Sequence, residues 1–166
     1  MKNIVLIGMA GSGKSTLGVL LAKSLGMPFV DTDLMIQQNE KKLLQEIIDT
    51  YGISRFLDIE EKVMLSIESI DSVIATGGSV VYSLQAMEHL KKHGRMVYLK
   101  LSYEEIEKRI QNITTRGIVM EEGKTLKDIF DERVVLYEKY ADIIIDCNDK
   151  DTELCLQNMI IKLIPM

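Results

Sequence analysis

The sequence has no tryptophan, only two prolines and two cysteines, and no long uninterrupted apolar run. Cys147 and Cys155 lack a C-x-x-C arrangement and further metal-ligand partners, which indicates inert core thiols in a reducing compartment rather than a disulfide. No apolar stretch approaches the roughly 18 residues of a membrane span. The N-terminus leads directly into an apolar strand rather than a signal peptide. These absences predict a cytoplasmic protein with no membrane partner.

The balance of charge gives no support to a nucleic-acid partner. The sequence has 20 lysines and arginines against 25 aspartates and glutamates, a formal net charge of -5. A general nucleic-acid-binding surface needs a basic excess. A hydrophobic content of 46% is ordinary for a globular protein, and 166 residues suffice for one sizeable core. We expect a single domain over residues 1–166 that acts as a monomer.

The glycine-rich stretch Gly8–Ser15 fits G-x-x-x-x-G-K-[ST], the phosphate-binding P-loop. A strand-like apolar run, Ile4–Ile7, precedes it, and leucines at helical spacing follow it as far as Gly26. A glycine-rich turn and a helix N-terminus together direct backbone N–H groups at phosphate oxygens. We therefore prefer a nucleotide site to a chance glycine-rich turn, with Lys14 reaching the β- and γ-phosphates and Ser15 ligating Mg²⁺. The motif residues expected to bind the nucleotide are Gly11, Ser12, Gly13, Lys14, Ser15 and Thr16.

Strand-like and helix-like stretches alternate along the rest of the chain. Further strands are expected at Met27–Val30, Val73–Thr76, Met96–Leu99 and Ile143–Ile145. Helices are expected over Leu34–Ile70 with a break at Tyr51-Gly52, after a capping box at Ser102–Glu105, and over Leu84–His93, Leu126–Tyr140 and Leu154–Leu163. This alternation predicts an α/β fold with a parallel sheet and right-handed crossovers. Residues 112 to about 124 lose the periodicity, which favours a mobile lid of the kind that kinases close over their substrates.

Polar residues follow two of the expected strands. Asp31 and Asp33 come after the second strand, at the rim where open α/β sheets bind ligands. One of them would orient an acceptor hydroxyl and take its proton, or the pair would help to hold Mg²⁺. A solvated turn or a helix N-cap at Asp33 is the alternative. Gly77 and Gly78 follow the third strand, where they either let a ligand approach the backbone closely or form a flexible turn.

These motifs, in this order, resemble the shikimate kinase family of P-loop kinases. The resemblance runs from Ile4 to the last helix and includes the P-loop, Asp31-Thr32-Asp33, Ala75-Thr76-Gly77-Gly78, Arg109 with Arg116, and Arg133-x-x-Leu136-Tyr137. It implies a three-layer P-loop fold with a five-stranded parallel sheet in the order 2-3-1-4-5 and helices on both faces. It also implies phosphorylation of a ring hydroxyl of shikimate by ATP with Mg²⁺, a step of aromatic amino acid biosynthesis.

The resemblance also implies roles for single residues. On the nucleotide side, Asp31 would lie near the metal, Arg109 would flank the adenine, and Arg116 would reach from the lid toward the phosphates. On the acceptor side, Asp33 would be the base or orienting residue, within a substrate-binding helical region at about 32–70. Gly77 and Gly78 would present backbone N–H groups to the substrate, Ser79 would add a hydroxyl there, and Arg133 would hold the substrate carboxylate. Arginine suits the last role because its fork matches carboxylates bidentately.

The acceptor side departs from the family pattern. Leu57 occupies the position of an arginine that grips the shikimate carboxylate, and Ser79 replaces a third glycine. The lid reads Arg116-Gly117-Ile118-Val119 instead of Arg-Pro-Leu-Leu, and Val135 replaces a proline. Two alternatives therefore stand beside shikimate phosphorylation. One is a diverged kinase of another polyol or hydroxy acid, which Leu57 favours. The other is a nucleotide-binding module without transfer activity, which the presence of the expected catalytic residues disfavours.

Overall fold

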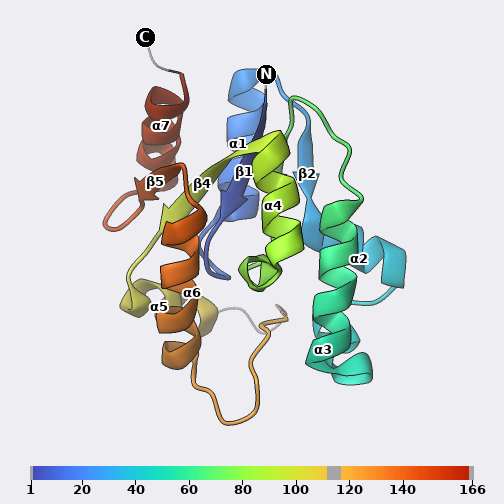
Figure 1. The fold of residues 1–166 in the computed structure, drawn as a ribbon. Coiled ribbons are helices and arrows are strands. Elements are labelled where there is room, and N and C mark those ends of the chain that lie inside the picture. Colours follow the sequence, from blue (N-terminus) through green and yellow to red (C-terminus); the bar gives the residue numbers. More distant parts are fainter. Residues whose placement is uncertain (1, 112–116, 165–166) are drawn as a thin grey trace.

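The structure, a computed structural model, describes residues 2–111 and 117–164. The protein is built on a five-stranded parallel sheet. The strands are β1 (Asn3–Ile7), β2 (Phe29–Asp31), β3 (Val73–Ala75), β4 (Gly94–Lys100) and β5 (Ile143–Asp146). They lie in the order β2-β3-β1-β4-β5, which confirms the expected order (Figure 1). All the strand pairings are parallel, so every strand ends at the same edge of the sheet.

Helices cover both faces of the sheet, as expected for a three-layer fold. The helices are α1 (Lys14–Leu25), α2 (Thr32–Glu40), α3 (Leu44–Leu65), α4 (Leu84–His93), α5 (Tyr103–Gln111), α6 (Leu126–Tyr140) and α7 (Thr152–Leu163), with a 3-10 turn η1 (Val80–Tyr82). Helix α1 packs with α7 behind the sheet in Figure 1, whereas α4 and α6 pack against β4 in front of it. The segment that leads into α6, and the loops after β1, β2 and β3, lie at the carboxyl end of the sheet.

Two hydrophobic clusters hold these layers together. The larger surrounds the central strand β1, whose five residues are all buried because both faces are covered. The smaller packs α2 against α3 and includes Val119 from the segment before α6. The region from α2 to α3 therefore has a core of its own, and the segment after residue 116 is attached to that core.

The helical region after β2 differs from the expected single helix with one break. Helix α2 ends at Glu40, where Lys41 adopts a left-handed φ of 54°, and α3 starts only at Leu44. The expected interruption at Gly52 is present as a kink with φ 82° inside α3, a conformation that glycine adopts without steric cost. Helix α3 ends at Leu65, five residues earlier than expected. Apolar periodicity thus located the helices but not the left-handed residue between them.

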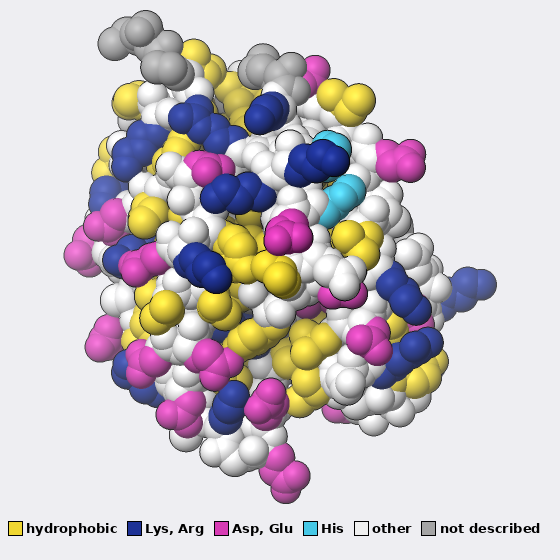
Figure 2. Space-filling view, viewed as in Figure 1, with side chains coloured by type: hydrophobic (Ala, Val, Ile, Leu, Met, Phe, Trp, Pro, Cys, Tyr) yellow, Lys and Arg dark blue, Asp and Glu magenta, His cyan; other side chains and the backbone are white. Residues whose placement is uncertain are grey.

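The surface of the face in Figure 2 carries both signs of charge. Lysines and arginines are more frequent toward the end where the chain termini lie, and aspartates and glutamates toward the opposite end. Among the described residues, no helix is long and apolar enough to cross a membrane.

Candidate active site

The P-loop joins β1 to α1 and forms a turn that only glycine tolerates. Gly11 and Gly13 have φ values of 79° and 92°, in the left-handed region. Gly13 is the N-cap of α1 and brings no capping side chain, so the first turn of the helix presents its N–H groups toward the loop. A helix start of this kind attracts an anion through both its N–H groups and its dipole.

Lys14 lies folded over its own loop. Its side chain is 6% exposed, and Nζ donates hydrogen bonds to the carbonyl oxygens of Gly8 at 2.7 Å and Met9 at 2.8 Å. Buried in this way, the ammonium group lies among carbonyl dipoles at the point where the motif predicts phosphates.

Asp31 connects the P-loop to the helix after β2. Its Oδ2 accepts a 2.6 Å hydrogen bond from Ser15 Oγ, and its Oδ1 accepts from the backbone N–H groups of Asp33 and Leu34. Asp31, rather than Asp33, is thus the N-cap of α2, and the extended geometry ends before Asp33. A hydroxyl and a carboxylate oxygen side by side are hard donors of the type that Mg²⁺ prefers, so the residues present fit that ion.

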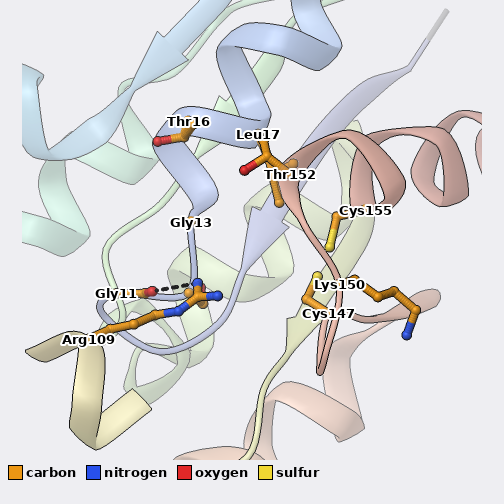
Figure 3. Close-up of a pocket in the computed structure, with 10 residues that line it drawn as sticks. Gly11, Gly13, Thr16, Leu17, Arg109, Cys147, Lys150, Thr152 and Cys155 are labelled. Carbon is orange, nitrogen blue, oxygen red and sulfur yellow. Dashed lines mark hydrogen bonds between the residues drawn. The ribbon is translucent and has the colours of Figure 1, made fainter. Parts of the chain in front are cut away.

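A cavity of about 420 Å³ opens beside the P-loop (Figure 3). Arg109 lies across it and donates from Nη1 to the Gly11 carbonyl at 3.2 Å, while its Nε pairs with Glu105 at 3.0 Å. Gly11, Ser12, Gly13 and Thr16 line the same cavity, so most of the expected nucleotide residues meet here. The described lining also includes Leu17, Lys150 and Thr152, which no motif had indicated.

The expected capping box before α5 forms only in part. Ser102 Oγ accepts from the Glu105 N–H at 3.3 Å, but the Ser102 N–H donates to Asn148 at 2.8 Å. The Glu105 carboxylate instead pairs with Arg109. The glutamate that the pattern assigned to the helix cap therefore orients the arginine of the nucleotide cavity.

The two cysteines form the wall opposite Arg109. Both are free and buried, as expected, and in Figure 3 their sulfur atoms point toward one another. Burial raises the pKa of the Cys147 thiol to about 12, and contact with Cys155 adds to the shift. Both sulfurs line the nucleotide cavity, a position that sequence spacing did not indicate.

A second, small cavity of about 40 Å³ collects the acceptor-side residues. Its described lining includes Lys14, Ser15, Asp33, Gly77, Gly78, Ser79 and Arg133. Residues from α1, α2, the loop after β3 and α6 thus meet at one place, next to the P-loop. Arg116, the expected lid arginine, lies outside the described residues.

Arg133 is a buried charge that holds the segment before α6. It is 1% exposed, donates from Nη2 to the Val119 carbonyl at 2.7 Å and from Nε to Tyr82 Oη at 3.2 Å, and stacks over the Tyr82 ring. One turn later Tyr137, also buried, donates its hydroxyl hydrogen to the Gly78 carbonyl at 2.5 Å. These two α6 residues, expected on one helix face, together fix two walls of the acceptor cavity.

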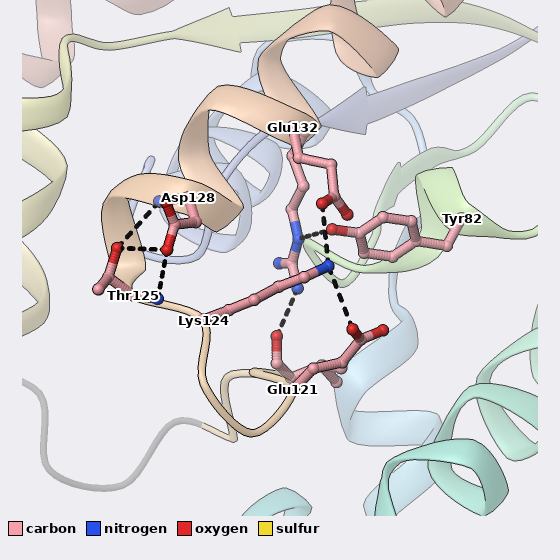
Figure 4. Close-up of polar contacts among 8 residues, drawn as sticks. Tyr82, Glu121, Lys124, Thr125, Asp128 and Glu132 are labelled. Carbon is pink, nitrogen blue, oxygen red and sulfur yellow. Dashed lines mark hydrogen bonds and ion pairs between the residues drawn. The ribbon is translucent and has the colours of Figure 1, made fainter.

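An ion-pair cluster on the surface reinforces the same attachment (Figure 4). Lys124 Nζ lies between Glu121 at 3.1 Å and Glu132 at 3.0 Å. Thr125 and Asp128 form the capping box that starts α6. Exposed pairs of this kind stabilise weakly, but here they join the described part of the expected lid to α6.

Glu60 belongs to this cavity as well, and it ends the stretch Phe56–Glu60, where the pattern of the resembled family has Phe-Arg followed by a glutamate three residues after that arginine. It is 2% exposed, and its Oε2 accepts a 2.7 Å hydrogen bond from Ser79 Oγ. Burial, together with the charge of Asp33, raises the pKa of Glu60 to about 7, against the lowering effect of the Ser79 hydrogen bond. A signal was present, since Glu60 lies four residues after Phe56 and four before Met64, on the buried stripe of α3.

Leu57 lies outside the acceptor cavity. It is half-buried and lines a separate cavity of about 160 Å³ with Tyr82, Val119 and Ile129. Arg55 is exposed, so it does not supply the missing cation. The described residues thus contribute two buried cations near the acceptor cavity, Lys14 and Arg133.

Comparisons with known proteins point to one family. A sequence model for shikimate kinase matches residues 10–164. The shikimate kinase of Thermodesulfovibrio yellowstonii is 42% identical over 149 residues, covering 88% of this chain and 86% of that protein. The shikimate kinase of Rippkaea orientalis is 39% identical over 166 residues, covering 98% and 88%. The structure of shikimate kinase from Acinetobacter baumannii in complex with shikimate superposes with a TM-score of 0.91 at 28% identity, covering 98% of this chain and 93% of that one.

Proposed function

This chain belongs to the shikimate kinase family of ATP-dependent kinases, and on that premise we propose that it phosphorylates a ring hydroxyl of shikimate. The observation that carries the proposal is the acceptor cavity, in which Lys14 of the P-loop and Asp33 of α2 line the same 40 Å³ space. A cation suited to bind phosphate and a carboxylate suited to act as a base thus line one small cavity, which supports the proposal. The product would be shikimate 3-phosphate.

The nucleotide would bind along the P-loop. The N–H groups of Gly11, Ser12 and Gly13 would hold the phosphates, with Thr16 beside them, and Arg109 would stack against the adenine in the larger cavity. Ser15 and Asp31 would ligate Mg²⁺ through the two oxygens that are hydrogen-bonded in this structure. Bound there, the ion would neutralise charge on the β- and γ-phosphates.

Phosphoryl transfer would follow from the arrangement of the side chains. Asp33 would accept the proton of the acceptor hydroxyl as its oxygen bonds to the γ-phosphorus, while the bond from phosphorus to the β–γ bridging oxygen breaks. Lys14 would leave the Gly8 and Met9 carbonyls and bind the phosphate oxygens on which charge develops. Arg133 would bind the acceptor carboxylate, and the backbone at Gly77, Gly78 and Ser79 would fix the ring. Arg116 and the closing lid, about residues 112–124, remain part of this proposal.

Leu57 is the observation that favours a second acceptor class. A carboxylate acceptor loses a charge-assisted contact there, which is worth roughly 2–5 kcal/mol in a desolvated site. The charged side chains that line the acceptor cavity already include both signs, from Lys14, Arg133, Asp33 and Glu60. Another polyol or hydroxy acid is therefore the alternative acceptor to test beside shikimate.

A coupled ADP-release assay with MgATP separates these cases. We expect turnover on shikimate, and we expect Leu57→Arg to lower the KM for shikimate while Leu57→Met, which adds no charge, leaves it unchanged. Asp33→Asn should lose turnover with ATP binding intact. Failure of the unmodified protein to use shikimate, with another polyol phosphorylated instead, would favour the alternative. A protein that binds ATP but phosphorylates no acceptor would support a binding module.

We also propose that the protein is a single-domain cytoplasmic monomer without a nucleic-acid or membrane partner. Two free, buried thiols suit a reducing compartment, and the net charge of -5 disfavours nucleic acid. Size-exclusion chromatography with light scattering, run at assay concentration, should give the mass of a monomer. The mass of a dimer would contradict this part of the proposal.

A further inference from the structure

A third cavity, of about 860 Å³, opens at the amino ends of the central strands, near the end of the molecule where Figure 1 marks both termini. Ile4 of β1 and Arg95 of β4 line it, together with Leu25 and Leu163, the last residues of α1 and α7. Its described lining shares no residue with the nucleotide cavity or the acceptor cavity. A volume of this size is in the range of about 300–1,000 Å³ in which proteins bind small molecules. The cavity is therefore a candidate site separate from the kinase chemistry.

Four aliphatic side chains give this cavity an apolar surface. Ile4 is buried, Leu25 and Leu163 are half-buried, and Ile164 is 52% exposed. Water in contact with such a surface is released when an apolar group covers it, which favours binding. The ligand that this surface suits carries an apolar body.

The charged residues of the same cavity are mostly basic. Lys2, Lys91 and Arg95 line it, against Asp142 as the carboxylate of the described lining. The whole chain has a formal net charge of -5, so the cavity is opposite in sign to the protein around it. A concave surface with this excess of positive charge attracts an anion.

The carboxylate of Asp142 is already engaged by the fold. Its Oδ1 pairs with Lys91 Nζ at 3.5 Å, and its Oδ2 accepts a hydrogen bond from the Met96 N–H group at 2.8 Å. Lys91 and Asp142 thus compensate each other. The excess positive charge of the cavity belongs to Lys2 and Arg95.

Arg95 also has a structural contact, which accounts for only part of this arrangement. Its Nη1 donates to the Leu163 carbonyl oxygen at 3.3 Å, at the end of α7, where a cation is favourable. A guanidinium group has five N–H donors, and this contact uses one of them. Lys2 precedes β1 and belongs to no helix, so helix capping does not explain its position beside the same apolar surface.

We propose that this cavity binds a small organic monocarboxylate with an aromatic body, the carboxylate near Lys2 and Arg95 and the ring against the aliphatic side chains. The planar fork of an arginine matches a carboxylate bidentately. Inorganic phosphate would leave the apolar surface uncovered, and a neutral hydrocarbon would leave the two cations unused. The site goes beyond the proposed function and does not depend on it.

The test measures binding of 2-naphthylacetate and of its neutral analogue 2-naphthylacetamide by fluorescence anisotropy. The chain has no tryptophan, so the naphthalene signal is read against a low protein background. We expect the acid to bind with a Kd below about 1 mM, and the amide about tenfold more weakly because it lacks the charge. MgATP and shikimate should not displace the acid, since neither of their proposed sites shares a residue with this cavity.

Two pairs of variants locate the ligand. Arg95→Gln should weaken binding of the acid about tenfold and leave the amide unchanged, whereas Lys92→Gln, an exposed neighbour outside the described lining, should change neither Kd. Ile164→Glu places a like charge in the cavity and should weaken the acid more than the amide. Ile161→Glu is its control, because Ile161 is 68% exposed on α7 and does not line the cavity.

Several results would overturn the inference. Equal Kd values for acid and amide, or no binding of the acid at 10 mM, would show that the cations and the apolar surface do not act together. An equal effect of Arg95→Gln and Lys92→Gln, or displacement of the acid by MgATP or shikimate, would place the ligand elsewhere. Thermal melting checks that each variant is folded. Should a variant unfold, the comparison of acid with amide on the unmodified protein still decides.

Discussion

The nucleotide cavity, which Gly11 and Thr16 line, and the acceptor cavity, which Lys14 and Ser15 line, adjoin the same P-loop but are built in different ways. The first is about 420 Å³ and lies along the contiguous turn Gly11–Gly13. The phosphate ligands proposed there are backbone N–H groups. The second is about 40 Å³ and is bounded by buried charged side chains from separate elements. A backbone site depends on local sequence, whereas a side-chain site depends on how distant helices pack. The acceptor half is therefore the part where a few substitutions change specificity.

Removing the charge of Lys14 should have the largest effect, a loss of kcat that originates in the P-loop. Lys14→Met keeps an apolar stem of similar length but loses the cation that binds the transferring phosphoryl group. We expect kcat to fall by about 10³-fold with the acceptor dissociation constant nearly unchanged. Single-turnover assays and acceptor titration measure the two effects. Lys23→Met, at the far end of α1, is the control that should retain activity.

Neutralising Glu60 should remove a pH dependence of the free energy of unfolding that originates in the acceptor half. The folded-state pKa of about 7 lies above the ordinary 4.5, so the folded protein retains a proton that the unfolded chain has already lost. Stability should therefore fall as pH rises from about 4.5 to 7 and then level off, at a cost of about 3 kcal/mol above pH 7. In Glu60→Gln this decline should disappear, which urea unfolding at pH 5 and pH 8 measures. The same decline in the variant would assign it to another group.

Removing the Tyr137 hydroxyl should have the smallest effect and should be confined to the acceptor half. Tyr137→Phe deletes the hydrogen bond to the Gly78 carbonyl and keeps the ring stacked on Tyr98. We expect about 1 kcal/mol of lost stability and a few-fold rise in the acceptor KM, with the ATP KM unchanged. Chemical denaturation and initial rates test this. An equal rise in both KM values would show that the hydroxyl supports the whole sheet edge instead.

The sequence predicts the P-loop side of the molecule more completely than the acceptor side. Gly8–Ser15 predicts a phosphate-binding loop because the motif and its flanking strand and helix are contiguous. The alternation of elements predicted a parallel sheet, and the family resemblance supplied its order, which is confirmed. The acceptor residues Asp33 and Arg133 were named in advance, and the structure brings them to one cavity.

What the sequence missed depends on contacts between distant residues. The burial of Glu60 arises only when α3 packs beside the loop that carries Ser79. Asp31 as the N-cap of α2 was missed because it depends on where β2 ends. The pairing of Glu105 with Arg109 depends on Asn148, which accepts the hydrogen bond from the Ser102 N–H group. Local patterns do not record such competition between partners.

The central position of β1 has a consequence for synthesis on the ribosome. Its neighbours come much later in the chain, since Ile4 pairs with Val73 in β3 and is level with Arg95 in β4. At about 5–20 residues per second, the apolar strand waits about 5–20 s for both partners to emerge. The P-loop, which directly follows β1, therefore gains a sheet on both sides of that strand only after β4 has left the ribosome. Slow translation upstream of β4 should therefore expose β1 to chaperones and to aggregation.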